Sequence, residues 1–380
     1  LAADNLARSP GRTGLVIASL AAGVALLIQT AGLTVSSKAA VLDWVDRTMS
    51  ADLFVFANSA LGGVGESRPM DEARGDDFRS LPEVAEAAGV RFQLIQYRTA
   101  MIYLLAADTD RLYQAEANRP QRPGRDLYPR LRQPGAAIAS DNFCSLHHVA
   151  LGDTIRLRGP DGTIELTPIG QVPYYAWNQG ALIIDREQFK QAFRDNQVDR
   201  FDIYLKPGSD REAARGAILR RWGAEHGLVV LTREEMHEQV DAVISRLYGM
   251  FYAQNVVIGL VAALGVVMAL LISVLQRRRE LGLLRAVGAS RGQIVLSVLV
   301  EAALMGTIGA GIGLLVGVPI EWYVLKVIML EETGFAFPVV IPWREALLVG
   351  SVAILTATLA GLGPAIHAMR LRIADAIAYE

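Results

Sequence analysis

The sequence LVIASLAAGVALLIQTAGLTV, from Leu15 to Val35, decides the fold class of this chain. It lies within residues 13–37, which contain no charged side chain. A helix of this length crosses a hydrocarbon core about 30 Å thick. Residues 13–37 are therefore predicted to form a membrane-spanning helix.

Three further stretches have the same apolar character. Residues 249–276 and 346–366 are uncharged, and residues 292–320 contain one charged side chain, Glu301. Each is long enough to span a bilayer as a helix. The chain is thus predicted to have four transmembrane α-helices, which place both termini on the same side of the membrane.

A secretory signal peptide is the alternative interpretation of the first stretch, because Arg8 and Arg12 precede it. The apolar region of a signal peptide has only about 7–15 residues and ends at a cleavage site. Here the apolar stretch continues through Lys38 into a helix-like sequence, AAVLDWVDRTM, so we interpret it as a span. The chain begins at Leu1 and not at Met, which suggests a piece of a longer polypeptide.

Arginines in the short loops predict the orientation, because positive charge is retained on the cytoplasmic side. The loop at residues 321–345 carries two cationic side chains against four glutamates, so it is predicted to face outward. The long segment at residues 38–248 then also lies outside, in the periplasm of a bacterium. The cytoplasmic arginines are Arg8, Arg12, Arg277, Arg278, Arg279, Arg285, Arg291, Arg370 and Arg372.

The predicted organisation is that of a multi-pass inner (plasma) membrane protein with both termini in the cytoplasm. A large periplasmic α+β domain is inserted between helices 1 and 2. The predicted segments are a cytoplasmic amphipathic segment (1–12), transmembrane helix 1 (13–37), the periplasmic domain with helical stalks (38–248), transmembrane helix 2 (249–276), a cytoplasmic coupling loop (277–291), transmembrane helix 3 (292–320), a short periplasmic loop (321–345), transmembrane helix 4 (346–366) and a cytoplasmic tail (367–380).

The α+β assignment of the outer segment rests on short β-type runs bounded by turn residues. Such runs occur at residues 52–56, 101–105 and 181–184, and a hairpin is predicted from residues 153–158 and 163–167 with Asp161-Gly162 at its turn. Helices are predicted at residues 71–88 and 210–222. Cys144 is the single cysteine and cannot form an internal disulfide, so it does not indicate the redox compartment.

Thr232 and Glu235 have the spacing of a capping box, which favours a helix that begins there. That helix can run directly into the second span, and a continuous helix would couple the outer domain to the membrane. The alternative is a capped helix that only packs on the outer domain. Both interpretations stay open from the sequence.

The cytoplasmic loop has the most specific sequence, RRRELGLLRAVGASRGQI, residues 277–294. Its apolar side chains Leu281, Leu284 and Val287 fall on one helical face, while its first arginines suit the membrane edge. An ordinary positive-inside loop has the same composition. The order of the residues is what distinguishes this one.

In that order the chain resembles the FtsX-like permeases of ABC transporters, which include the macrolide-exporter and lipoprotein-releasing permeases. The resemblance rests on Arg279 to Ser290, on Asn5 to Thr13, on the sequence VALGDT at residues 149–154 and on Gly363-Pro364-Ala365 near the end of the chain. It covers nearly the whole chain. It implies that the loop binds a cytoplasmic ABC ATPase through Arg279, Glu280, Leu281, Leu284, Arg285, Gly288 and Ala289.

The chain contains no phosphate-binding G-x-x-x-x-G-K-[ST] motif, so we expect no ATP site, no cofactor and no enzymatic activity of its own. A metal site is also not expected. His147 and His148 lie near Cys144, but the sequence offers no properly spaced second half-site for zinc.

Glu301 is the one ionisable residue within a predicted span. It can belong to a proton or substrate route, or it can pack between helices as a neutral or hydrogen-bonded group, which we favour. Gly309, Gly313 and Gly317 have the four-residue spacing of a close helix contact. Four helices make a poor closed pathway, so we expect a second permease unit, either in a homodimer or as the preceding half of a longer chain.

Three functions remain open at this stage. The first is a permease that moves or extracts lipid, lipoprotein, peptide or drug with a partner ATPase. The second is a transmembrane signal transmitter that activates a periplasmic cell-wall hydrolase, and the third is a sensor or scaffold without an ATPase. The expected partners are an ABC ATPase, a second permease unit, the lipid bilayer and a periplasmic protein in the second case, with no nucleic acid. Tyr174, Tyr175 and Trp177 can contact a lipid or partner, or pack on their own domain.

Overall fold

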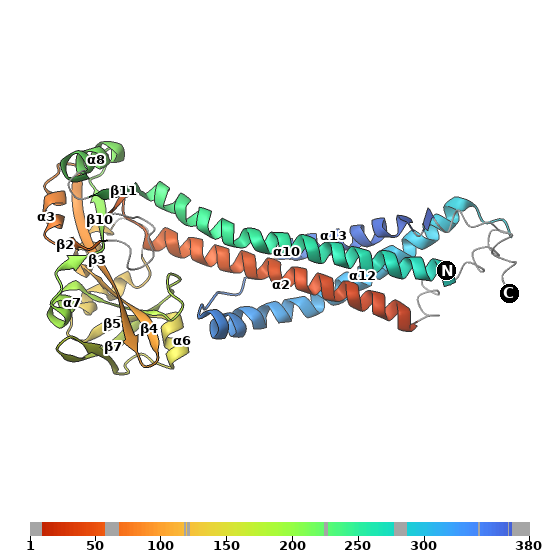
Figure 1. Cartoon of the computed structure of the whole chain (residues 1–380), viewed down its shortest axis with the longest axis horizontal. Helices are drawn as coiled ribbons and strands as arrows, with labels where there is room; N and C mark the ends of the chain where they lie inside the picture. The colour runs from red at the N-terminus through yellow and green to blue at the C-terminus, as the bar shows by residue number, and fades with distance from the viewer. Residues whose placement is uncertain are drawn as a thin grey trace. The chain divides into compact units, whose positions relative to one another are not determined.

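The computed structural model describes residues 10–57, 68–117, 119, 122–223, 227–276, 287–340, 343–363 and 365–366. The chain divides into two compact units, whose elements are labelled in Figure 1. The helical unit comprises residues 1–38, 245–327 and 338–380. The α+β unit comprises residues 39–244 and 328–337.

The apolar stretches of the sequence form long helices. They are α2 (Pro10–Thr48), α10 (Arg233–Gln276), α12 (Arg291–Tyr323) and α13 (Trp343–Ala360), and a π-helix, η3 (Val324–Thr333), directly follows α12. Three helical segments are long and apolar enough to cross a membrane: Ile17–Thr48, Arg233–Gly265 and Arg291–Thr333. The apolar helix Ala346–Ala360, at the fourth predicted span, is shorter. Four spans are thus predicted, and three of them meet this criterion in the described part of the chain.

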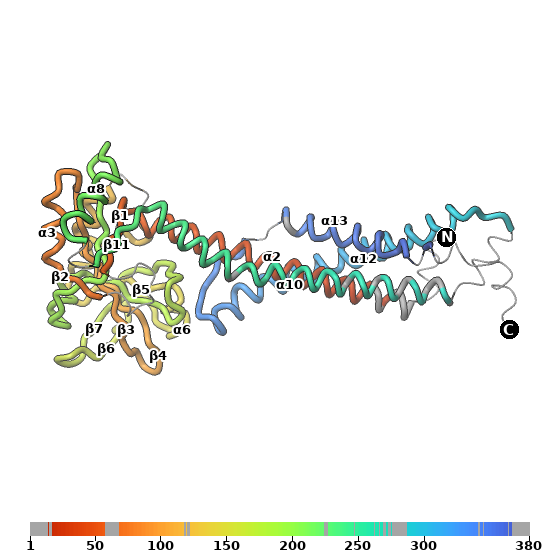
Figure 2. Tube along the Cα trace, turned by 45° about the horizontal axis from the view of Figure 1, so that its top comes forward, coloured from red at the N-terminus to blue at the C-terminus, as the bar shows by residue number. Residues whose placement is uncertain are grey.

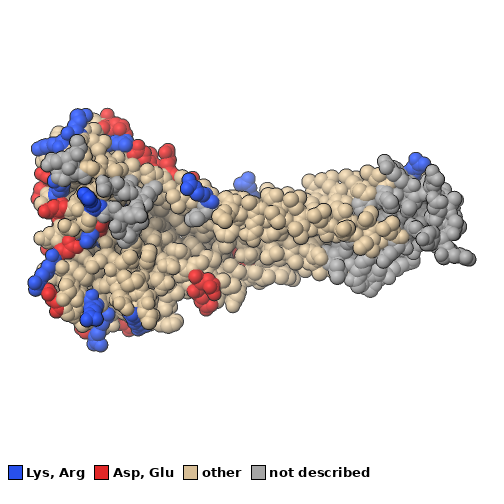
Figure 3. Space-filling view, in the orientation of Figure 1, with Lys and Arg blue, Asp and Glu red and all other residues tan. Residues whose placement is uncertain are grey.

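The surface of the described helices matches their composition. Figure 3 shows Lys, Arg, Asp and Glu side chains gathered on the α+β unit, whereas the visible face of the described helical unit consists mainly of other residues. On α10 the large apolar side chains Met250, Val261 and Leu264 are 76%, 64% and 64% exposed. Exposed apolar side chains over a helix of this length are the pattern of a lipid-facing segment.

α2 and α10 lie beside one another in both Figure 1 and Figure 2. In the helical unit, Lys38 Nζ lies 3.5 Å from Ser245 Oγ, and the hydroxyl of Tyr248 donates a hydrogen bond to Ser37 Oγ. In the α+β unit, His237 Nδ1 lies 3.1 Å from a carboxylate oxygen of Asp46. Each unit thus contains its own contacts between these two helices.

The α+β unit is built on a nine-stranded mixed sheet with the strand order β11-β1-β10-β3-β4-β8-β5-β7-β6. Neighbouring strands are antiparallel except for β4–β8 and β5–β7. Its strands are β1 (Leu53–Ala57), β3 (Val84–Tyr97), β4 (Ala100–Ala107), β5 (Ala136–Ser140), β6 (Ile155–Gly159), β7 (Gly162–Val172), β8 (Ala181–Asp185), β10 (Arg200–Leu205) and β11 (Leu228–Thr232). A two-stranded sheet pairs β2 (Met70–Asp71) with β9 (Gln197–Val198).

Short helices cover the sheet, and four of them begin at a side-chain cap. Asp108, Ser140, Asp185 and Asp210 each accept a hydrogen bond from a backbone amide in the first helical turn, which satisfies a donor that the helix leaves free. The helices are α3 (Arg74–Arg79), α4 (Thr109–Ala115), η1 (Arg125–Leu127), α5 (Tyr128–Leu131), α6 (Asp141–His147), α7 (Arg186–Phe193), α8 (Arg211–Ile218) and η2 (Leu219–Gly223).

Alternating side chains place the core on both faces of the sheet. Leu53, Val55 and Ile203 are fully buried in one cluster, where Phe78 packs edge-on against Trp222 at 5.3 Å. Phe54 and Tyr204, from the same two strands, belong to a cluster on the other face. The period of two in a strand produces this alternation.

The predicted helix at residues 71–88 is wrong in its second half. The helix α3 ends at Arg79, and Val84 begins a 14-residue strand that pairs with β10 and β4. Pro82 cannot continue the helix, and the alanines that follow have helix propensity but lie buried in the sheet: Ala87 and Ala88 are 1% and 0% exposed. The tertiary pairing outweighs the local propensity here.

The other predicted elements agree with the structure. The three strand runs correspond to β1, β4 and β8, and the helix at residues 210–222 corresponds to α8 and η2. The predicted hairpin is β6–β7, but its turn lies one residue earlier than expected. Gly159 pairs with Gly162, so Pro160 and Asp161 are the central turn residues.

Candidate coupling site

The two long helices join the sheet at one place. Four residues, 49–52, separate the end of α2 from the start of β1 at Leu53, and β11 ends at Thr232 directly before α10. β1 and β11 are antiparallel neighbours in which Leu53 pairs with Thr232. Both helices therefore connect to the same end of one strand pair, and we call residues 48–53 and 232–235 the junction.

Asp52 is the central side chain of the junction and is 7% exposed. Its carboxylate accepts a hydrogen bond from the backbone amide of Leu205 at 2.8 Å and from Arg119 at 3.1 Å, and Arg211 Nε lies 3.7 Å from it. Its backbone carbonyl accepts a hydrogen bond from the amide of Arg233 at 3.2 Å. One residue thus ties the start of β1 to β10, to α8 and to the first residue of α10.

The start of α10 has the predicted capping box. The amide of Glu235 donates to Thr232 Oγ1 at 3.2 Å, and the amide of Thr232 donates to Glu235 Oε2 at 3.0 Å. Glu235 also pairs with Arg215 of α8 at 2.9 Å, and Glu234 pairs with Arg211. The first turn of α10 is therefore held to the sheet and to α8.

A buried polar cluster lies next to the junction. Glu116 and Asp202 are both fully buried. Ser50 and Tyr204 each donate a hydrogen bond to Glu116 Oε1 at 2.7 Å, and Arg122 lies 2.8 Å from Glu116 and 3.4 Å from Asp202. Ser50, in the connection between α2 and β1, is thereby fixed to the interior of the α+β unit.

Arg122 stays charged in this cluster. Burial alone disfavours its charge, but the surrounding Tyr128, Glu116, Tyr204 and Asp202 outweigh that effect and hold the pKa of Arg122 well above its ordinary value. A buried guanidinium between two carboxylates makes the cluster sensitive to the loss of any partner.

Within the α+β unit, an aromatic cluster holds residues 328–337, which follow α12 in the sequence, against the rest of the unit. The ring of Tyr175 stacks on Phe337 at 5.3 Å, and its hydroxyl donates to the carbonyl of Ala336 at 3.3 Å. Trp44 of α2 packs edge-on against Tyr174 at 5.5 Å and Tyr175 at 6.0 Å. We call residues 328–337 the strap, because these contacts fasten them to the α+β unit.

The contacts of these rings decide between the two interpretations that the sequence leaves open, a contact with a lipid or partner and packing on their own domain. Burial raises the pKa of Tyr175 to about 12, so its phenol is neutral at physiological pH. The indole of Trp177 donates to the carbonyl of Met101 at 2.7 Å and lies 4.7 Å from the ring of Tyr103. Tyr174, Tyr175 and Trp177 therefore pack on their own domain.

Most of the predicted ATPase-binding loop lies outside the described residues: Arg279, Glu280, Leu281, Leu284 and Arg285 are in this group. Gly288 has φ +106°, a conformation that favours glycine, and a Cβ there would meet no atom within 4 Å. Ala289 follows, and Ser290 caps α12 in a capping box with Gln293, with bonds of 3.2 and 2.8 Å. The S-x-x-Q spacing of this second box is visible in the sequence, although we did not predict it.

The predicted packing glycines of α12 lie against α2 in the helical unit. A Cβ at Gly309 would lie 2.8 Å from Leu20, one at Gly313 would lie 2.6 Å from Val24, and one at Gly317 would lie 3.0 Å from the Cα of Ala25. The first two distances are too short for a side chain and the third is tight, so the two helices approach closely along this line. Glu301, on the same helix, is 7% exposed.

Sequence reasoning missed a second buried acid on α12. Glu321 was assigned to an outward loop at residues 321–345, but α12 continues to Tyr323 and η3 continues to Thr333. Glu321 is 1% exposed, and Gly32 of α2 provides the space that its carboxyl group occupies. Its position becomes apparent only when α2 and α12 are placed together.

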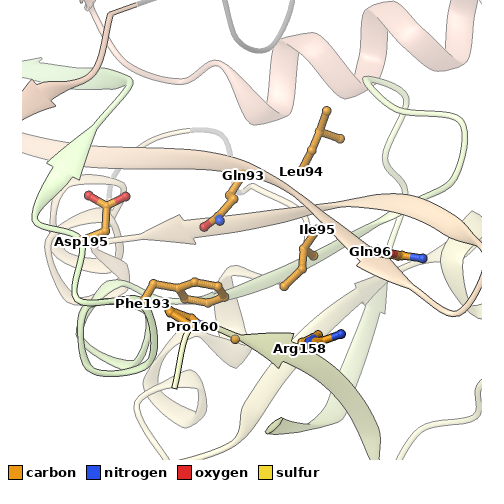
Figure 4. A pocket seen from close by; sticks show the side chains of 9 residues that line it. Gln93, Leu94, Ile95, Gln96, Arg158, Pro160, Phe193 and Asp195 are labelled. Atoms are coloured by element: carbon orange, nitrogen blue, oxygen red, sulfur yellow. The ribbon is translucent and has the colours of Figure 1, made fainter. Parts of the chain in front are cut away.

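A hollow of about 490 Å³ lies on the α+β unit between β3, the β6–β7 turn and the end of α7 (Figure 4). Its acidic residue, Asp195, is paired with Arg91 at 2.9 Å. Gln93, Gln96 and Arg158 supply its other polar side chains, and Phe193 and Pro160 supply apolar ones.

The histidines near Cys144 have structural contacts. His147 Nε2 lies 3.2 Å from the carbonyl oxygen of Gln179, and burial lowers the pKa of His147. Burial also raises the pKa of Cys144 to about 11, so its thiol is not reactive at neutral pH. Within the described residues, no group of three or more His, Cys, Asp or Glu side chains could hold a metal ion.

The fold thus defines a membrane protein in which long apolar helices are joined to an α+β domain through paired strands. Residues 13–221 match the MacB-like periplasmic core domain family, and residues 253–373 match the C-terminal region of the FtsX-like permeases. The chain therefore belongs to the FtsX-like and MacB-like family of ABC transporter permeases.

The names of proteins with similar sequences agree with this family. The chain is 24% identical over 388 residues to an uncharacterized ABC transporter permease protein of Mycobacterium tuberculosis. The alignment covers 100% of this chain and 45% of that protein. It is 25% identical over 387 residues to the macrolide export ATP-binding/permease protein MacB of Chromobacterium violaceum, covering 97% of this chain and 58% of that protein. The chain spans about half the length of these curated relatives. The periplasmic region of MacB from Actinobacillus actinomycetemcomitans aligns with 52% of this chain at 7% identity and a TM-score of 0.36.

Proposed function

We propose that this permease couples ATP hydrolysis by a partner cytoplasmic ABC ATPase to motion of its periplasmic domain, and that this motion moves or extracts lipid, lipoprotein, peptide or drug. One observation carries the proposal. α10 is a single helix from Arg233, at the sheet, to Gln276, which directly precedes the predicted ATPase-binding loop at residues 277–291. A helix transmits displacement along its axis because its hydrogen bonds keep its length fixed.

The junction supports this proposal at the sheet end of the helix. Asp52, Thr232 and Glu235 fasten the first turn of α10 to β1, β11 and α8, so a displacement of α10 would move the sheet with it. The strap, which follows α12 in the sequence, is a second segment that is fastened within the α+β unit. We further propose an inner-membrane location with both termini in the cytoplasm and a working unit that contains two such permease units.

Affinity purification from detergent-solubilised membranes tests the ATPase partner. Wild-type chain is compared with a double variant of the loop, Glu280→Arg with Leu284→Asp, and the retained proteins are identified by mass spectrometry. The matched control is Arg156→Glu with Leu151→Asp, which makes a charge reversal and an apolar-to-acid change at exposed positions of the α+β unit. We expect an ABC ATPase with the wild type and with the control, and its loss with the loop variant.

Other outcomes reject parts of the proposal. If the loop variant retains the same ATPase, the loop assignment is wrong. If the folded wild type retains no ATPase, the sensor or scaffold function takes precedence. If a cell-wall hydrolase is retained together with the ATPase, the signal-transmitter function takes precedence over transport.

A further inference from the structure

In the described part of the chain, Glu321 is a buried acid without a hydrogen-bond partner. It is 1% exposed, and neither of its carboxylate oxygens has a hydrogen-bond donor among the residues that the structure describes. A buried polar group normally has such a partner. The side chain therefore needs a further explanation.

The carboxyl group fills a notch in the neighbouring helix. A Cβ at Gly32 of α2 would overlap the carboxyl group of Glu321. The preceding close contacts between the two helices are at Gly309, Gly313 and Gly317. In each of them the small residue belongs to α12 and the larger neighbour belongs to α2. At the next contact the small residue is on α2 and the large one is on α12, so the pair Gly32–Glu321 continues the helix interface.

Among the residues that the structure describes, none near Glu321 provides a compensating charge. Residues 13–37 of α2 contain no charged side chain, and Glu301, the next acid on α12, is about 30 Å away along the helix axis. Lys38 lies six residues beyond Gly32 and approaches Ser245 at 3.5 Å. Among the described side chains of residues 322–344, the titratable ones are exposed; they are Tyr323, Lys326, Glu331, Glu332 and Arg344. On α10, which lies beside α2, the half-buried Tyr248 donates its hydroxyl to Ser37.

An ionised carboxylate in this position would be strongly unfavourable, because no described residue replaces the water that it loses. A bound proton removes that charge. We propose that Glu321 is a proton-binding site, which takes up a proton when α2 and α12 pack at Gly32 and releases it to water when this contact opens. In the packed state the group is a neutral carboxylic acid, and opening converts it to a carboxylate and a free proton.

Proton binding and helix packing are then linked. Lower pH favours the packed state, and the ratio of packed to open states changes by up to about tenfold per pH unit where the two states differ by one proton. The inference does not depend on the partner ATPase, so its test uses the purified chain alone.

Infrared difference spectroscopy on the purified chain in phosphatidylcholine vesicles at pH 7 reads the protonation state directly. A protonated carboxylic acid has a C=O stretching band that a carboxylate lacks. We expect the wild-type spectrum minus that of Glu321→Gln to show this acid band, and Glu301→Gln to retain it. Difference bands of an ionised carboxylate at this position, including bands that shift on addition of Na⁺, would overturn the proposal.

A second variant tests the link to packing. Gly32→Leu should expel the carboxyl group from the notch, so the acid band of Glu321 should be lost at pH 7 and replaced by carboxylate bands. Gly14→Leu is the control, since a Cβ at Gly14 meets no atom within 4 Å. Both variants must elute as one species with wild-type helix content. Retention of the acid band in folded Gly32→Leu would show that packing does not control the proton.

Discussion

The backbone amide of Arg233 donates a hydrogen bond to the carbonyl oxygen of Asp52 at 3.2 Å. The first residue of α10 is thereby bonded to the residue that precedes β1, 181 positions earlier in the sequence (233 − 52). This bond closes the junction between two segments that are distant in the sequence. The side chain of the same residue, Asp52, makes the other polar contacts of the junction.

Asp52→Asn should weaken the junction while preserving its shape. The amide keeps the size of the side chain but removes the charge that Arg119 and Arg211 face, at a cost of about 1.5–3 kcal/mol. We expect a lower apparent melting temperature of the detergent-solubilised chain, with retention of the ATPase in affinity purification and weaker stimulation of its hydrolysis. Unchanged stimulation in this variant would show that the junction does not transmit motion.

Removal of Glu116 should be more damaging than removal of an exposed acid. Glu116→Ala leaves Arg122 and the hydroxyls of Ser50 and Tyr204 without their acceptor, which costs about 3–5 kcal/mol for a buried pair. The control Glu165→Ala breaks an exposed pair with Arg156 and should cost about 0–1 kcal/mol. Thermal unfolding of the two variants measures the difference, and equal shifts would contradict the burial argument.

Gly313→Ala should disturb the contact between α2 and α12. Its methyl group would lie 2.6 Å from Val24, and such overpacking costs about 1–3 kcal/mol. Gly311→Ala, two residues earlier, has no atom within 4 Å of the new methyl group and should be neutral or stabilising. The melting temperatures of the two variants in detergent check this prediction; a larger loss in Gly311→Ala would place the helix contact elsewhere.

Tyr175→Ala should release the strap from the α+β unit. It removes the ring stacked on Phe337 and the hydrogen bond to Ala336, whereas Tyr175→Phe removes only the hydrogen bond. We expect faster proteolysis or amide exchange at residues 328–337 in the alanine variant, and a much smaller change in the phenylalanine variant. Equal exchange in both variants and the wild type would show that the rings do not hold the strap.

The Tyr175 contact should be insensitive to pH over the physiological range. The pKa of this phenol is raised by burial to about 12 from an ordinary value of 10.0, so the folded state favours the neutral form. Its contribution to stability is complete below pH 10 and is lost as the pH rises towards 12. Exchange at the strap measured at pH 7 and pH 9 should therefore differ only by the intrinsic effect of pH on exchange, as in Tyr175→Phe.

Local sequence patterns predicted much of this fold. The apolar stretches gave the long helices, the alternation of polar and apolar residues gave the β6–β7 hairpin, and the Thr232–Glu235 spacing gave the start of α10. These signals act over a few residues, so they are visible without the tertiary structure. The alanine-rich residues after Pro82 were misleading, because their strand is selected by pairing with β10, more than 100 residues away.

The parts of the site that sequence reasoning missed depend on distant contacts. Glu321 pairs with a notch at Gly32, and Tyr175 packs on Phe337, with no sequence pattern that connects either pair. The Gly309, Gly313 and Gly317 spacing indicated a close helix contact but not its partner, which is α2. Most of the ATPase-binding loop remains a prediction from its resemblance to the family.

The antiparallel pairing of β1 and β11 has a mechanical consequence. Since Leu53 pairs with Thr232 at the end where both helices attach, a common push on α2 and α10 carries the two strands together and leaves their ladder unstrained. A force that spreads the helices apart instead loads the ladder from this end, so its bonds break one at a time, as in a zipper. The Arg233–Asp52 bond lies at this end, so a spreading force would load it before the bonds further along the ladder.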